Sequence, residues 1–94
     1  MSETTYRVVL HREALREIRA LPKEMRTQVR GVVDELRTEP RPPGASPLKG
    51  HKGAFRIRIG DYRLVYEVHA TEIVVYVIGV AHRREAYLRL LRRR

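Results

Sequence analysis

Apolar residues in the first part of the chain recur at helical spacing, in two runs. In residues 11–21 they stand at Ala14, Leu15, Ile18 and Leu21. In residues 22–36 they stand at Met25, Val29, Val32, Val33 and Leu36. Pro22 separates the two runs, and proline is tolerated at the start of a helix but not inside one. The pattern predicts a helical hairpin with a very short connection.

Three later segments carry the signals of β-strands. Residues 54–59 and 62–68 alternate apolar and polar positions, which is the period of a strand with one buried face. Residues 73–80 are nearly all apolar, which fits a strand buried on both faces. The short turns at residues 60–61 and 70–71 predict an antiparallel meander. A β-rich stretch at residues 5–10 predicts one further strand at the start of the chain.

The remaining segments are a loop and a last helix. Residues 38–53 are rich in proline and glycine, so we expect no regular element there, with Leu48 packing inward. Residues 82–91 have helical character. The predicted order is strand, helix, helix, strand, strand, strand, helix. This is an α+β fold in one domain, residues 1–94, with a single antiparallel-rich sheet, the N-terminal helical hairpin on one face and a C-terminal helix.

The charge of the chain is unevenly distributed. The formal net charge is +9. Residues 1–40 hold eight Lys/Arg and seven Asp/Glu, whereas residues 41–94 hold twelve and four. A first part with nearly balanced charge followed by a strongly basic part indicates a face that binds a polyanion. The alternative is that the basic residues serve solubility and form a frayed C-terminal tail. No apolar run is long enough to cross a membrane and no signal peptide is visible, so we expect a cytoplasmic protein without a membrane partner.

Arginines on the predicted sheet are the first candidates for a binding site. Arg56 and Arg58 lie two residues apart on one strand, so both point to the same face, about 6.5–7 Å apart. Cross-strand pairing can bring Arg63 beside them to form a phosphate cradle. The alternative for Arg56 and Arg58 is a solvated outer face, and for Arg63 an ion pair with Glu67.

A second cluster follows the last predicted strand, where His82, Arg83 and Tyr87 come close together in sequence. An imidazole with a pKa near 6.5 is suited to general acid–base chemistry, although a helix cap or a surface residue is the alternative for His82. Carboxylates are sparse in the basic half and there is no cysteine. A Mg²⁺ site needs clustered carboxylates, so we expect neither a metal nor a cofactor.

Three stretches spanning most of the chain form a recognisable pattern: YRVVLHREALREIRALP, PLKGHKGAFRIRIGDYRLVYEV and VIGVAHRREAY. Together they resemble the RelE/ParE superfamily of bacterial toxin–antitoxin toxins. RelE-like members are mRNA interferases that cut mRNA in the ribosomal A site. ParE-like members poison DNA gyrase and generally lack the catalytic residues.

The resemblance implies a set of site residues and partners. The implied catalytic residues are Arg63, His82, Arg83 and Tyr87. The implied RNA-binding residues are Lys49, Lys52, Arg56, Arg58 and Arg84. The expected partners are a cognate antitoxin, mRNA in the ribosomal A site and ribosomal RNA. We therefore expect a toxin that acts as a ribosome-dependent endoribonuclease without metal, through attack by the substrate's 2′-OH. A ParE-like gyrase inhibitor and a non-catalytic RNA-binding relative are the alternatives.

Overall fold

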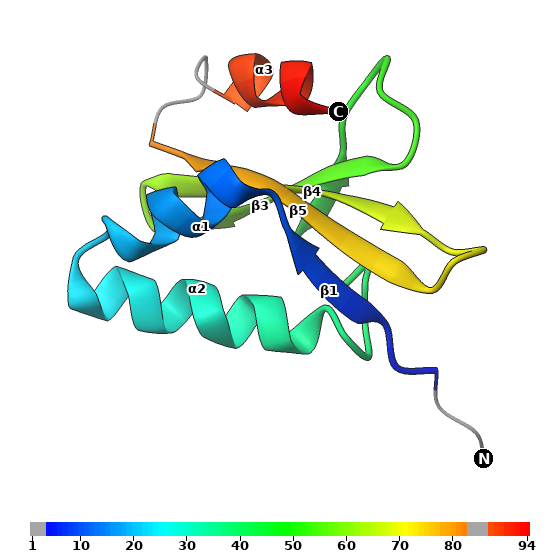
Figure 1. Ribbon diagram of the computed structural model, residues 1–94, viewed down its shortest axis with the longest axis horizontal. Helices are drawn as coiled ribbons and strands as arrows, with labels where there is room; N and C mark the ends of the chain where they lie inside the picture. Colours follow the sequence, from blue (N-terminus) through cyan, green and yellow to red (C-terminus); the bar gives the residue numbers. More distant parts are fainter. Residues whose placement is uncertain (1–3, 83–86) are drawn as a thin grey trace.

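A five-stranded sheet forms the centre of the computed structural model, which describes residues 4–82 and 87–94 (Figure 1). The strands are β1 (Arg7–Leu10), β2 (Ala45–Pro47), β3 (Ala54–Ile59), β4 (Tyr62–His69) and β5 (Val74–Ala81). The helices are α1 (Arg12–Arg19), α2 (Lys23–Glu35) and α3 (Tyr87–Leu90), which continues into a 3₁₀ turn, η2 (Leu91–Arg93). The predicted α+β fold with a helical hairpin and a C-terminal helix is confirmed.

The helical hairpin packs on one face of the sheet, which we call the first face. His11 caps α1, since its Nδ1 accepts a hydrogen bond from the backbone N–H of Glu13 at 3.0 Å. Pro22 directly precedes α2, as the sequence predicts. The core beneath the hairpin is completed by apolar residues of the central strands, among them Leu64, Tyr66, Val75 and Val77, all fully buried. Of the helices that the structure describes, none is long and apolar enough to cross a membrane.

The strand order is β1-β5-β4-β3-β2. The predicted antiparallel meander of β3, β4 and β5 is confirmed, and β1 runs parallel to β5 at the sheet edge. The prediction that residues 38–53 lack a regular element is wrong at Ala45–Pro47, which pairs antiparallel with Phe55–Ile57. A proline is compatible with this strand because it lies at an edge, where one side of the backbone needs no partner.

The C-terminal residues cover part of the opposite face, which we call the second face. Figure 1 shows α2 and α3 on opposite sides of the sheet. Leu90 and Leu91 are buried there against residues of β4 and β5, and Leu48 packs into the same cluster, so its predicted inward orientation is confirmed. The described helix is shorter than the predicted one. It spans Tyr87–Leu90 with Leu88 exposed, and residues 83–86 of the prediction lie outside the described residues.

Tyr66 ties the long loop to the sheet. Its buried hydroxyl donates a hydrogen bond to the carbonyl oxygen of Pro40 at 2.8 Å, and its ring stacks on Phe55 with centroids 5.7 Å apart. Burial raises the pKa of Tyr66 to about 12, against an opposing effect of Arg41. The neutral hydroxyl is therefore part of the folded state.

We predict that Tyr66→Phe lowers the free energy of unfolding at neutral pH by about 1 kcal/mol, because the Pro40 carbonyl loses its donor. An unfolded tyrosine ionises near pH 10, whereas folded Tyr66 keeps its proton to about pH 12. The parent therefore loses the stability contributed by Tyr66 as the pH rises from about 10 towards 12, and the variant does not. Urea titrations across this range should show the stability difference shrinking. A constant difference would contradict the assignment.

Candidate functional site

Three arginines come together on the second face through the register of β3 and β4. Arg58 lies directly opposite Arg63, and Arg56 lies opposite Val65. Directly opposite residues of an antiparallel pair have Cβ atoms about 4.5–5.5 Å apart, and residues two apart on a strand share a face. The predicted grouping of Arg63 with Arg56 and Arg58 is therefore present, and we call it the arginine cluster.

No carboxylate among the described residues pairs with Arg63. Glu67, the acidic residue nearest in sequence on that face, instead binds Arg94 and lies 2.9 Å from Nε2 of His69. Arg63 is half-buried, and its Nε is the one buried side-chain nitrogen or oxygen in residues 4–82 and 87–94 that lacks a hydrogen-bond partner. Two opposed arginines with an unsatisfied buried donor form an arrangement that an anion would complete.

His82 lies at the same end of the sheet as the arginine cluster. It directly follows Ala81, which pairs with Arg63. Its side chain is exposed, and its ring lies against Tyr62, with centroids 4.9 Å apart. Tyr62 packs with the core of the first face, so the imidazole sits at the end of the sheet beside the cluster rather than over it. Sequence reasoning missed Tyr62, because its contact with His82 depends on the alignment of two strand ends.

The remaining predicted site residues either lie away from the arginine cluster or fall outside the described residues. Lys49 and Lys52 are exposed on the loop before β3, at the end of the sheet where Ala54 faces Glu67. Lys52 is six residues from Arg58, which corresponds to about 20 Å of extended chain. Arg83 and Arg84 lie outside the described residues, as does the side chain of Tyr87.

The described residues contain no group of three or more His, Cys, Asp or Glu side chains able to hold a metal ion. His69 lies between Glu67 and Glu72, but one oxygen of Glu67 is bound by Arg94.

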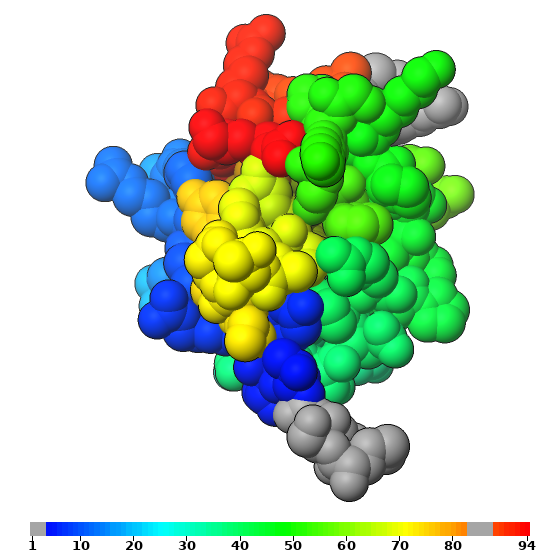
Figure 2. Space-filling view, turned by 90° about the vertical axis from the view of Figure 1, so that its right-hand side faces the viewer, coloured from blue at the N-terminus to red at the C-terminus, as the bar shows by residue number. Residues whose placement is uncertain are grey.

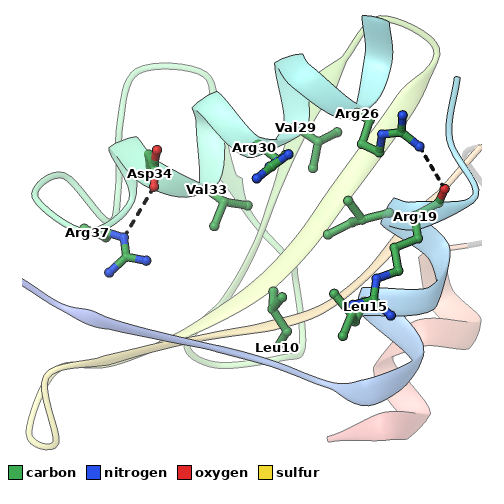
Figure 3. A pocket seen from close by; sticks show the side chains of 10 residues that line it. Leu10, Leu15, Arg19, Arg26, Val29, Arg30, Val33, Asp34 and Arg37 are labelled. Carbon is green, nitrogen blue, oxygen red and sulfur yellow. Dashed lines mark hydrogen bonds and ion pairs between the residues drawn. The ribbon is translucent and has the colours of Figure 1, made fainter. Parts of the chain in front are cut away.

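A groove on the first face is lined by α1, α2 and β1 (Figure 3). Its volume is about 470 Å³. Leu10, Leu15 and Val33 give it an apolar floor, and Leu15 is 37% exposed. Its rim is basic, with Arg19, Arg26, Arg30 and Arg37. Arg37 pairs with the only acidic residue of the lining, Asp34, at 3.5 Å, so the rim keeps an excess of positive charge.

The sequence matches a known family over most of its length. Residues 8–87 match the family described as ParE toxin of type II toxin-antitoxin system, parDE. The mRNA interferase toxin RelE of Escherichia coli K12 is 35% identical over 75 residues, covering 78% of this chain and 78% of that protein.

Solved structures agree with the fold. A mutant of E. coli toxin RelE in the free state superposes with a TM-score of 0.78 and 30% identity, covering 95% of this chain and 97% of that one. The archaeal RelE–RelB complex from Pyrococcus horikoshii OT3 contains a chain with a TM-score of 0.77 and 29% identity, with coverage of 85% and 97%. The sheet, the hairpin and the matched sequence thus define a toxin of a toxin–antitoxin system. The chain belongs to the RelE/ParE superfamily.

We predict that Arg63→Met leaves the protein folded and abolishes the rise in melting temperature that phosphate causes in the parent. Methionine keeps an apolar stem but removes one of two opposed charges, so the melting temperature at low salt should not fall. Phosphate bound to the native arginine cluster should raise the melting temperature of the parent but not of the variant.

The matched control for this prediction is Arg12→Met, which removes the same charge from an exposed position on α1. This control should respond to phosphate as the parent does. Equal stabilisation of the parent and of Arg63→Met by phosphate would show that the arginine cluster is not the anion site.

Proposed function

We propose that the chain is a toxin that cleaves mRNA on the ribosome, using the 2′-OH of the RNA as nucleophile and no metal ion. The observation that carries the proposal is the arginine cluster, where Arg58 and Arg63 face each other and a buried donor lacks a partner. RNA phosphates supply the missing anion. The RelE relatives named as mRNA interferases supply the reaction class.

The reaction requires the protein to stabilise the charge on the phosphoryl oxygens, to remove the proton of the 2′-OH and to protonate the leaving 5′ oxygen. The 2′ oxygen forms a bond to phosphorus as the bond to the 5′ oxygen breaks, leaving a 2′,3′-cyclic phosphate and a 5′-OH. Arg63 and Arg83 stabilise the negative charge that grows on the phosphoryl oxygens, because positioned guanidinium donors bind the transition state more strongly than the substrate. Arg56 and Arg58 bind flanking phosphates, and Lys49, Lys52 and Arg84 contact the RNA further away.

Proton transfer is assigned to His82 and Tyr87. One group takes the proton of the 2′-OH and another protonates the leaving 5′ oxygen. His82 is exposed at the strand end, where it can reach a substrate. Because arginine stays protonated, the arginine cluster cannot act as the base. The ribosome supplies the remaining rate enhancement by holding the codon in an attack-ready geometry.

A second candidate function is inhibition of DNA gyrase, because residues 8–87 match the ParE toxin family. A gyrase inhibitor needs a protein-binding surface and no proton transfer. The unpartnered Arg63 and the neighbouring His82 favour cleavage, because neither residue is required by the core.

One experiment separates the two functions. Purified protein is incubated with ribosomes programmed with a defined mRNA, and cuts are mapped by primer extension. The same preparation is added to a gyrase supercoiling assay. Cleavage within the A-site codon without gyrase inhibition supports the proposal, and the reverse result supports the ParE-like function.

We predict that His82→Gln lowers the single-turnover cleavage rate sharply while ribosome binding changes little. Glutamine keeps hydrogen-bonding capacity but cannot exchange a proton near neutral pH, so the substitution should act on proton transfer. The pH profile of the cleavage rate should therefore differ between the parent and the variant. A variant that cuts at the parent rate would leave proton transfer to Tyr87, a ribosomal group or water.

An antitoxin partner follows from the family, since similar structures include complexes of RelE with RelB. The basic second face is one place for the antitoxin, because an acidic or amphipathic segment would complement its charge. The first-face groove is a further place for it, because an apolar floor with a rim of arginines fits an acidic amphipathic helix. Such a helix would leave the arginine cluster uncovered, so a second antitoxin segment would be needed to reach it.

We predict that Leu15→Glu weakens antitoxin binding by at least about 10-fold, since it places a charge in the apolar floor of the groove. The comparison variant is Leu88→Glu, at a position 57% exposed on the opposite face, where it tests for contact of the antitoxin with the second face. Titration calorimetry with the cognate antitoxin measures both affinities. A loss of affinity in Leu88→Glu alone would place the antitoxin on the second face only.

A further inference from the structure

Strand β5 extends beyond the end of its outer neighbour in the sheet, β1. β1 stops at Leu10, which pairs with Val77, and the N–H of His11 then donates to the Val77 carbonyl at 2.9 Å. The chain turns away into α1 at this point. Beyond Val77 none of the described strands lies outside β5, although residues 78–81 are all buried. The backbone groups of these residues on that side need other partners.

An ion pair supplies those partners. Oε1 of Glu17, from α1, accepts a hydrogen bond from the Val80 N–H at 3.1 Å. Nη1 of Arg93, from η2, donates to the Ile78 carbonyl at 3.0 Å. The two side chains also bind each other through two hydrogen bonds, of 3.0 and 2.7 Å. Glu17 and Arg93 therefore pair with β5 as one more residue of an outer strand would.

Gly79 leaves the space in which this ion pair lies. A Cβ at residue 79 would stand 2.6 Å from Nη1 of Arg93 and 2.7 Å from Oε1 of Glu17. The register of β5 against β4 shifts at the same place, since Val65 pairs with Gly79 and Tyr66 pairs with Val77. The local irregularity of β5, the glycine and the ion pair thus form one unit, which we call the β5 clamp: Glu17, Gly79 and Arg93.

We propose that the β5 clamp is a positioning device for the RNA-cleaving site. The clamp fixes Val80, two residues before His82, and it fixes η2, which directly follows α3. The clamp therefore links the end of β5, which precedes His82, to the helical segment that begins at Tyr87. His82 and Tyr87 are both candidate site residues. Glu17 and Arg93 are positioning residues, because they act through the strand end and the helix rather than on the RNA. This inference rests on the proposed function.

The ion pair is not the main source of stability of the C-terminal segment. The side chains of Arg93 and Glu17 remain 21% and 29% exposed, which limits the free energy that such a pair contributes. Leu90 and Leu91 are also buried in the apolar cluster on the second face, which gives the segment a second source of stability. Removing the ion pair should leave the segment docked but less well fixed. The expected effect is on the geometry of the site and not on folding.

The test compares Arg93→Met with Arg92→Met, which removes the same charge from the exposed neighbouring residue. Single-turnover cleavage on programmed ribosomes gives the maximal rate and the half-saturating concentration separately. Hydrogen exchange of the Val80 amide reports on the clamp itself. We expect Arg93→Met to speed exchange of this amide and to lower the maximal rate about 10- to 100-fold, with an unchanged half-saturating concentration. Arg93→Lys, which keeps the charge, should recover part of the rate.

Each other outcome overturns a defined claim. If Arg93→Met cleaves at the parent rate, or if Arg92→Met loses as much rate, the β5 clamp does not position the site. If the Val80 amide exchanges as in the parent, the clamp is absent in solution. If the parent itself does not cleave, the proposed function fails, and the positioning role fails with it.

Discussion

The pairing of β3 with β4 is the constraint on which the site depends, because it sets Arg58 opposite Arg63. The next opposed pair along the two strands, Ile57 and Leu64, is buried on the other face of the sheet. A slip of one residue in register would expose that apolar set, so the core holds the like charges together. The cost of placing two like charges opposite each other is offset by the burial of the apolar residues on the first face.

The last two arginines of the chain each bind an acidic side chain, Glu67 on β4 and Glu17 on α1. Arg94 binds the carboxylate of Glu67 and the carbonyl oxygen of Lys52, and Figure 2 shows the C-terminal residues, in red, packed against the green segment that includes Lys52. Arg93 does the same for Glu17. Glu67 is therefore not available to neutralise Arg63. Arg93 and Arg94, which resemble part of a frayed basic tail in the sequence, are thus bound to the folded domain through Glu17 and Glu67. Neither carboxylate neutralises the arginine cluster.

The parts of the fold that depend on local periodicity were predictable from sequence. The helical hairpin and the strand at Ala54–Ile59 follow from apolar spacing, and the alternation of Arg56 and Arg58 with Phe55 and Ile57 assigns the two faces. The three-residue strand β2 was not predictable, because it exists only through its pairing with β3. The β5 clamp was not predictable either, because Glu17 and Arg93 are 76 residues apart in sequence. For the site, sequence found the arginines but not Tyr62, the residue on which His82 rests.

We propose that the arginine cluster holds RNA phosphates. The most direct measurement follows the Nε–Hε signals of the arginine side chains by NMR while a 2′-O-methyl trinucleotide, which cannot be cleaved, is added at low salt. We expect the signal of Arg63 to shift most, the signal of Arg58 to shift with it, and the signals of Arg30 and Arg37 in the first-face groove to stay unchanged. Shifts centred on the groove, or no shift at Arg63, would show that RNA does not bind at the arginine cluster.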